Sequence, residues 1–219
     1  MTTPINVDIW ADIACPWCFI GKRKFEEGLK GFDGEVNVTY HSYELAPDTP
    51  IDFEGSEVDF LANFKGMPKA QVEQMLESVR NVATEVGLNY DFNALQHTRT
   101  FKAHEAIHFA KLNGKQEEMV ELLYSAYFEK GKHLGRVDEL VAIGAQIGLN
   151  AEAMKAALEN ADFAEDVTAD INQARSLGIK GVPFFVFNYR YGVSGAQPPE
   201  IFAQVLNDVA KEAAGAQDI

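Results

Sequence analysis

Hydrophobic and polar residues alternate at the two ends of the chain, whereas in the middle the hydrophobic residues recur at helical spacing. Near the N-terminus, the stretch INVDIW (5–10) alternates β-branched apolar residues with others, which predicts a strand. Residues 19–29 carry apolar side chains at a helical period, and Gly31 supplies a stop signal. Residues 35–45 alternate again and predict a second strand. The chain therefore begins as strand, helix, strand.

The middle of the chain, from 57 to 178, predicts only helices, most of which end at Gly or Asn. After it, VPFFVFN (182–188) and RYGVSG (190–195) predict two short strands joined by a tight turn. The segment 197–214 predicts a last helix with prolines near its start, where a missing N–H costs least. The predicted helices of the middle region are 57–64, 67–87, 100–114, 116–131, 136–148, 151–160 and 163–178.

This order of elements predicts an α/β fold of the form βαβ…ββα with a large helical insertion. We expect residues 1–50 and 179–219 to form one small α/β domain. Residues 51–178 would form an inserted α-helical domain. A chain of 219 residues with 47% hydrophobic content is large enough to bury such a core.

The charge of the chain limits its partners. The formal net charge is −14, so a nucleic-acid backbone or an anionic lipid surface would be repelled. The N-terminus has no basic segment followed by an apolar run, and no stretch approaches about 18 consecutive apolar residues. We expect a soluble, cytosolic protein that binds neither nucleic acid nor membrane; the sequence does not predict its oligomeric state.

The candidate chemistry begins with Cys15 and Cys18, the only two cysteines, which stand where the first strand gives way to the helix. A structural disulfide across so short a loop would gain little stability from chain entropy. Zinc needs about four ligands, and no second cysteine pair is present to complete a site. The spacing therefore favours a redox-active pair, with no bound metal or cofactor.

A second motif points to a different chemistry. The stretch HEAIH, from His104 to His108, matches the zinc-protease pattern that places two imidazoles on one face of a helix. A third ligand would be needed downstream, and only His133 remains there. We interpret these histidines as buried or cleft-lining residues of the inserted helices, and we expect no metal site.

Several motifs together resemble the DsbA-like thioredoxin superfamily: CPWC at a helix start, GVPFFVFN late in the chain, and a helical insertion between them. The stretches 7–29, 43–48 (YELAPD) and 190–202 (RYGVSGAQPPEIF) resemble its FrnE-type branch of cytosolic disulfide oxidoreductases. The resemblance implies a thioredoxin fold with an inserted helical domain. It also implies an enzyme that exchanges disulfides with protein substrates.

The physical chemistry of a helix start assigns a role to each sulfur. The positive end of the helix dipole favours a thiolate, and the N-terminal sulfur of such motifs is usually the exposed attacker. We expect Cys15 to attack a substrate disulfide and Cys18 to resolve the mixed disulfide. Trp17 would contact a docked peptide or simply pack locally. By resemblance, Pro183 would be a cis proline facing the cysteines, leaving the backbone of Val182 to pair with an extended substrate.

A glutathione-dependent enzyme is the alternative reading. Kappa-class transferases and 2-hydroxychromene-2-carboxylate isomerases belong to the same superfamily, but the transferases place serine where Cys15 stands. Glutathione remains a possible co-substrate, because Gly195, Ala196 and Gln197 precede a helix N-terminus that suits a carboxylate; an ordinary turn is an equal reading.

Two further points concern proton transfer and direction. A buried acid often assists proton transfer in this fold, and Asp8 and Asp12 are both near enough in sequence; the sequence does not choose between them. For a pair with a reduction potential of about −120 mV in a cytosol at about −280 mV, the equilibrium would favour the dithiol over the disulfide by more than about 10⁵-fold. We therefore expect a reductase or isomerase during ordinary growth.

Overall fold

Four strands form one mixed sheet at the centre of the protein, in a computed structural model that describes residues 4–215. The strand order is β2-β1-β3-β4. The central strand β1 (Ile5–Ala11) runs parallel to β2 (Val36–Ser42) and antiparallel to β3 (Phe184–Phe187), which pairs antiparallel with β4 (Tyr191–Ser194). This is the βαβ…ββα arrangement that the sequence predicts.

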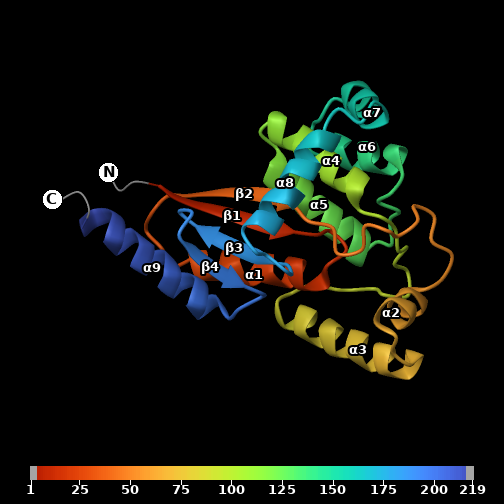
Figure 1. Cartoon of the computed structure of the whole chain (residues 1–219), viewed down its shortest axis with the longest axis horizontal. Coiled ribbons are helices and arrows are strands. Elements are labelled where there is room, and N and C mark those ends of the chain that lie inside the picture. Colours follow the sequence, from red (N-terminus) through yellow and green to blue (C-terminus); the bar gives the residue numbers. More distant parts are fainter. Residues whose placement is uncertain (1–3, 216–219) are drawn as a thin grey trace.

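The helices of the described residues divide into two groups (Figure 1). α1 and α9 flank the sheet, whereas α2–α8 lie between β2 and β3 in the sequence. Figure 1 shows α4–α7 at the end of the molecule away from both termini, with α2 and α3 as a separate pair beside them. The bounds are α1 Pro16–Leu29, α2 Glu57–Lys65, α3 Lys69–Glu85, α4 Phe101–Leu112, α5 Gln116–Phe128, α6 Val137–Ala145, α7 Ala151–Glu159, α8 Ala164–Ser176 and α9 Pro199–Gly215.

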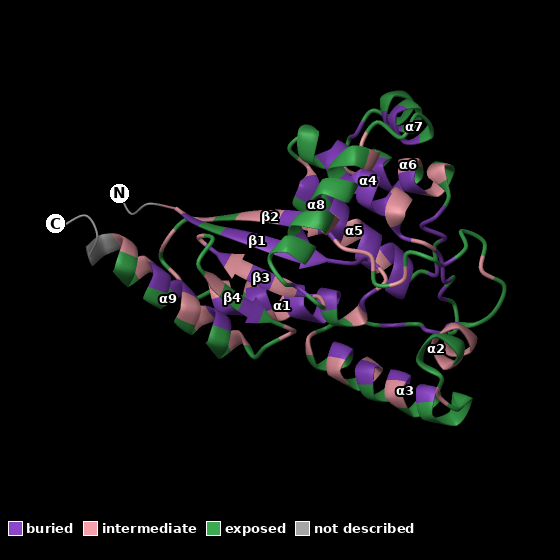
Figure 2. Ribbon diagram, in the orientation of Figure 1, coloured by how far each residue is buried: buried purple, intermediate pink, exposed green. Residues whose placement is uncertain are grey.

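The central strand is buried on both faces, and even the polar Asp8 on it is buried. Val7 and Ile9 belong to the main core together with residues of α1, α9 and the inserted helices. Trp10 points to the other face and packs with Ala174 of α8 and with Ile179. Colouring by burial shows the same contrast, with β1 and α5 largely buried and α7 largely exposed (Figure 2).

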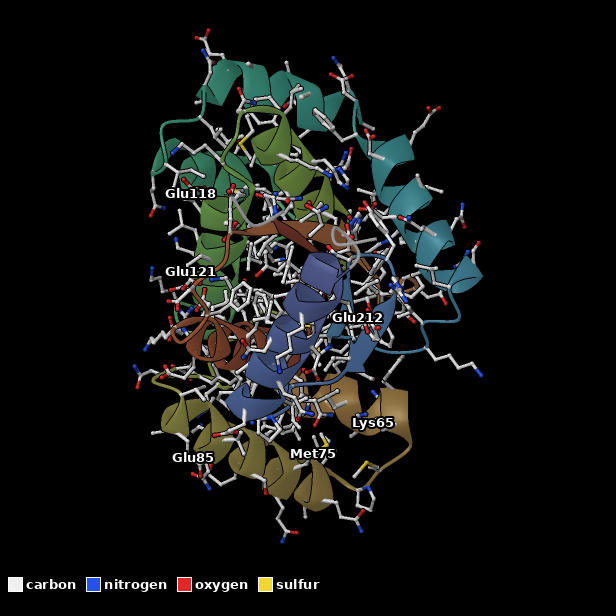
Figure 3. All side chains as sticks on the ribbon, turned by 90° about the vertical axis from the view of Figure 1, so that its left-hand side faces the viewer. Lys65, Met75, Glu85, Glu118, Glu121 and Glu212 are labelled. Atoms are coloured by element: carbon white, nitrogen blue, oxygen red, sulfur yellow. The ribbon has the colours of Figure 1, made fainter. Side chains whose placement is uncertain are left out.

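The inserted helices share a continuous core with the sheet. Phe19 of α1 stacks on Tyr124 of α5 with 4.9 Å between the ring centroids. Gln116 of α5 hydrogen-bonds both the N–H and the C=O of Tyr40, so it satisfies backbone groups on the outer edge of β2. Arg23 of α1 forms an ion pair with Glu121, which Figure 3 labels on α5. The insertion therefore helps to fix both α1 and β2.

Two element boundaries differ from the prediction, for local reasons. The second strand ends at Ser42 instead of continuing to 45, because the N–H of Leu45 turns to the carboxylate of Asp12 at 2.7 Å. The last helix begins at Pro199, because the N–H of Gln197 bonds the carbonyl of Gly195 in a turn at 3.0 Å. Within residues 4–215, no helix has the length and apolar character needed to span a bilayer.

Candidate active site

The two cysteines lie in the turn that joins β1 to α1. Cys15 is the N-cap residue of α1 and Pro16 occupies the first helical position, where its missing N–H is not needed. The N–H of Cys15 donates to the carbonyl of Asp12 at 3.1 Å, and the N–H of Cys18 donates to the carbonyl of Cys15 at 3.0 Å. Both cysteines are free thiols. The helix start therefore holds the two side chains one turn apart.

The expected exposure of the attacking sulfur is not found. Cys15 is only 4% exposed and Cys18 3%, so residue exposure does not distinguish them. Cys15 is covered because its thiol donates to the carbonyl of Val182 at 3.6 Å. Cys15 nevertheless lines a cavity beside the helix start, whereas Cys18 does not.

The electrostatics of the pair are asymmetric. Burial raises the pKa of the Cys18 thiol well above its usual value, and the hydrogen bond and charge of Cys15 raise it further. Cys18 therefore holds its proton more strongly than an ordinary thiol. The assignment of the attacking thiolate to Cys15 stays a prediction from its place at the helix start.

The loop before β3 faces the cysteines, as the sequence analysis expected. The peptide bond between Val182 and Pro183 is cis. A Cβ at Gly21 of α1 would lie 2.9 Å from the Cγ of Pro183, so only a glycine allows the proline ring to approach the helix this closely. The carbonyl of Pro183 accepts the N–H of Gly195 at 2.8 Å. Val182 and Pro183 are thus brought to Cys15, while their role toward a substrate stays a prediction.

The structure distinguishes the two candidate acids. Asp12 is 1% exposed and accepts hydrogen bonds from the hydroxyl of Thr100 at 2.8 Å and from the N–H of Leu45. The Nε2 atom of His104 lies 3.5 Å from its Oδ1. Burial alone would raise the pKa of Asp12, but these partners, His104 foremost, lower it. Asp12 is therefore a fixed negative charge beside the cysteines.

Asp8 lies on the other face of the sheet. Its Oδ1 contacts Nε2 of His41 at 2.8 Å, and the Nδ1 atom of that ring contacts Asp170 of α8 at 2.8 Å. Trp10, two residues further along β1, stacks on His41 on this same face. Asp12, not Asp8, adjoins the cysteines.

A cavity of about 210 Å³ lies between the start of α1 and the pair α2–α3. Trp17 lines its edge and is 40% exposed, while its contact with a docked peptide stays a prediction. Figure 3 labels Lys65 on α2 and Met75 on α3, which both line the cavity. The other wall residues include Cys15, Phe60, Val79, Glu57 and His97.

The candidate glutathione segment is a turn beside the proline loop. Gly195 donates its N–H to Pro183 and Gln197 donates its N–H to Gly195, so two of these three N–H groups have internal partners. The carbonyl of Ala196 accepts from the amine of Lys24 at 3.3 Å. The segment lies near the cysteines, but glutathione binding by it stays a prediction.

The two histidines of HEAIH go to different partners. His104 faces Asp12, whereas Nε2 of His108 contacts Asp170 at 3.1 Å and the hydroxyl of Ser42 at 3.2 Å. Glu105 between them is fully buried, with the amine of Lys102 2.8 Å from its Oε2. Among residues 4–215, no group of three His, Cys, Asp or Glu side chains is arranged to hold a metal ion.

Sequence reasoning missed the buried pair Glu57–His97 and the close packing at Gly21. Glu57 and His97 come from segments 40 positions apart, and their side-chain atoms meet at 2.7 Å in the cavity wall. The only local signal is a capping box, in which Ser56 and Asp59 start α2 and so position Glu57. Nothing in the sequence near residue 97 indicates that its ring reaches α2.

A family model for the DSBA-like thioredoxin domain matches residues 6–207. A solved "probable DsbA oxidoreductase" from Streptomyces coelicolor is similar to 96% of this chain and 90% of its own, with 36% identity and a TM-score of 0.88.

Two more distant structures show likeness of fold alone. The cytosolic disulfide reductase DsbM from Pseudomonas aeruginosa, solved with GSH, matches 94% of this chain and 99% of its own (18% identity, TM-score 0.66). A 2-hydroxychromene-2-carboxylate isomerase matches 96% and 98% (13% identity, TM-score 0.72). A reductase and an isomerase thus share this architecture, so the fold does not choose between them.

Proposed function

The chain belongs to the DSBA-like thioredoxin domain family, and from this premise we propose that it is a thiol–disulfide oxidoreductase acting on protein disulfides. The observation that carries the proposal is the unequal pair at the start of α1. Cys18 is held as a thiol by its raised pKa, while Cys15 adjoins both the Val182–Pro183 loop and the cavity. An attacking sulfur and a resolving sulfur require this inequality.

The reaction is a pair of exchanges at sulfur. The Cys15 thiolate attacks one sulfur of a substrate disulfide, so a mixed disulfide forms and the other substrate sulfur leaves as a thiolate. Cys18 then loses its proton and attacks the sulfur of Cys15, which releases the second substrate thiolate and forms the Cys15–Cys18 disulfide. Two equivalents of a reducing thiol return this disulfide to the dithiol, and in a cytosolic thiol pool the dithiol is the resting form.

We propose glutathione as the reducing thiol and the cytosol as the location. The neighbour solved with GSH is described as a cytosolic disulfide reductase, and it covers nearly all of this chain. The turn 195–197 beside Pro183 is the segment proposed to receive a glutathione carboxylate. Placement in the FrnE-type branch belongs to the same proposal and rests on the motifs of the sequence.

The glutathione-transferase and isomerase reading receives less support from the residues. Those transferases activate glutathione with a serine at the position of Cys15, and a second thiol has no part in that chemistry. Here both thiols are present, and the pKa of the second one is raised by burial and further by Cys15.

Two variants test the assignment. Cys15→Ser should abolish the acceleration that the protein gives to insulin reduction by dithiothreitol, while Cys18→Ser should accumulate mixed disulfides on Cys15. In the native protein at neutral pH, iodoacetamide should alkylate Cys15 faster than Cys18. Conjugation of chlorodinitrobenzene to glutathione serves as the contrasting assay. Faster alkylation of Cys18, or conjugation that survives Cys15→Ser without any insulin reduction, would reject the proposal.

A further inference from the structure

Part of the wall of the cavity beside Cys15 has no role in the proposed exchange reaction. One side is the helix start with Cys15 and Trp17, and the opposite side is apolar, with Phe60 of α2 and Val79 of α3. Its volume is about 210 Å³. An apolar cavity of about 150 Å³ is enough to hold benzene, so one aromatic ring fits this space.

A buried acid–imidazole pair lies in the same wall. Glu57 is 7% exposed and His97 5%, and Oε2 of Glu57 contacts Nδ1 of His97 at 2.7 Å. The imidazole stacks on Phe60 with 3.4 Å between ring centroids, which fixes the plane of the ring. Neither residue takes part in the bonds that hold the cysteines or the proline loop.

This pairing determines what the imidazole can offer to an occupant. With Nδ1 facing the carboxylate of Glu57, Nε2 is the ring atom left for an occupant, and in the tautomer that donates from Nδ1 it accepts a hydrogen bond. Within the described residues, Nε2 of His97 forms no hydrogen bond, and the side chain lines the cavity. The site therefore suits an apolar ring that ends in a hydrogen-bond donor.

We propose that this cavity is a subsite for a tyrosine or tryptophan side chain of the substrate protein, close in sequence to its reacting cysteine. The inference rests on the proposed function, since the occupant must be carried by a chain that is joined to Cys15 during exchange. The phenol or indole would lie against Phe60 and donate to Nε2 of His97.

The rim of the cavity supports a polypeptide occupant. Trp17, Leu45 and Phe64 all line the cavity and remain 40%, 41% and 57% exposed, respectively. Large apolar side chains gathered at one opening mark a surface that a partner covers. Such a surface lets the substrate chain on either side of the tyrosine or tryptophan exclude water while Cys15 reacts.

The experiment compares peptide disulfides that differ at one position. Disulfide-linked peptides carry Tyr, Phe or Ala at each of the three positions on either side of the cysteine, and glutathione disulfide is the reference substrate without an aromatic ring. At the best position, we expect kcat/KM to rise about tenfold from Ala to Phe and several-fold more from Phe to Tyr. Ring burial supplies the first step and the hydrogen bond to His97 the second.

Three variants isolate the subsite. His97→Asn keeps an amide where Nδ1 met Glu57 but removes the acceptor, so Tyr should lose its advantage over Phe. Ala46→Phe fills the cavity from its half-buried rim, so the kcat/KM of the Tyr peptide relative to glutathione disulfide should fall more than tenfold. Ala70→Phe, on the exposed side of α3, is the matched control and should leave that ratio unchanged.

The outcomes separate this proposal from the one on which it rests. Equal rates for the Tyr, Phe and Ala peptides at every position, with glutathione disulfide still reduced, would overturn the subsite and leave the oxidoreductase standing. Loss of all exchange in the native protein would reject both proposals. A fall in the ratio for Ala70→Phe equal to that for Ala46→Phe would also overturn the subsite.

Discussion

His104 and His108 stand one turn apart on α4, yet they belong to two clusters built around different carboxylates. His104 reaches Asp12 beside the cysteines, whereas His108 reaches Asp170. Both clusters contain buried aspartate and histidine, and each leaves one buried polar atom without a partner, Oδ2 of Asp8 in one and Nε2 of His104 in the other. They differ in that only the cluster around Asp12 adjoins the cavity that Cys15 lines. That difference separates a structural cluster from a functional one.

The cluster around Asp170 has a fully paired carboxylate at its centre, although Oδ2 of Asp8 at its outer end has no partner. The Asp170 carboxylate contacts Nδ1 of His41 at 2.8 Å, the N–H of Ser42 at 2.8 Å and Nε2 of His108 at 3.1 Å. Burial would raise the pKa of Asp170, but His108 and His41 hold it well below its usual value. These contacts join α8 and α4 of the insertion to β2. The cluster docks the inserted helices on the sheet and offers nothing to a ligand.

The cluster around Asp12 adjoins a cavity and a nucleophile. Asp12 is itself saturated, but Nε2 of His104 has only the 3.5 Å contact, outside good hydrogen-bond geometry. Asp12, Cys15, Glu57 and His97 all line the cavity. The buried charges around Asp12 belong to the candidate active site because the sulfur of Cys15 and a cavity lie beside them. The cluster around Asp170 has no such sulfur next to it.

The largest effect on stability should come from removing the carboxylate at the centre of the Asp170 cluster. Asp170→Ala removes the carboxylate from three partners and leaves His41 without half of its charge compensation. We expect a loss of about 3–5 kcal/mol in the free energy of unfolding, measured by urea denaturation. The rate of Cys15 alkylation in the folded protein should not change. A strong change in that rate would mean that the two clusters are coupled.

The next effect should come from Asp12→Asn, which acts on the site itself. The carboxylate raises the pKa of Cys18 through its charge, so removing the charge should lower that pKa and favour the resolving thiolate. Mixed disulfides should therefore resolve faster in rapid-quench experiments, at a stability cost of about 1–3 kcal/mol for the lost hydrogen bonds. Asp8→Asn, on the other face, is the control and should not alter resolution.

The local parts of the site were predictable from the sequence and the tertiary ones were not. Cys15 and Cys18 at a helix start and the cis bond before Pro183 follow from short motifs. Asp8 and Asp12 are four residues apart, so a continuous strand would place both on one face; β1 ends at Ala11, and Asp12 lies in the turn that carries the cysteines. The contact between Glu57 and His97 depends on how α2 packs against the segment before α4, and no local sequence pattern indicates that packing.

A smaller effect should appear in the pH dependence of stability. Burial would lower the pKa of His41, but Asp170 and Asp8 outweigh burial and raise it. The folded state therefore keeps the proton on His41 to a higher pH than the unfolded chain, which releases it at about pH 6.5. This contribution is complete below that pH and is lost as pH rises through the raised pKa of the folded state.

Denaturant unfolding between pH 6 and 9 measures this contribution. The free energy of unfolding should decline with pH in the native protein, and the decline should become shallower in His41→Asn. Asp170 adds the opposite limb, since its lowered pKa gives stability that is lost only as pH falls below about 4. An identical pH profile for His41→Asn would show that His41 is not charged in the folded protein.

The smallest effect should be that of a chelator, which tests the two clusters as a possible zinc site. His104 and His108 contact different carboxylates, so a shared metal would require Asp12 and Asp170 to give up their present partners. We expect EDTA to leave insulin reduction and the melting temperature unchanged, and His104→Ala to lower stability while exchange stays within about twofold. Metal analysis that finds about one zinc per chain, lost on replacing either histidine, would contradict the separation of the clusters. It would instead indicate that the two histidines share one metal centre and that the protein is a hydrolase.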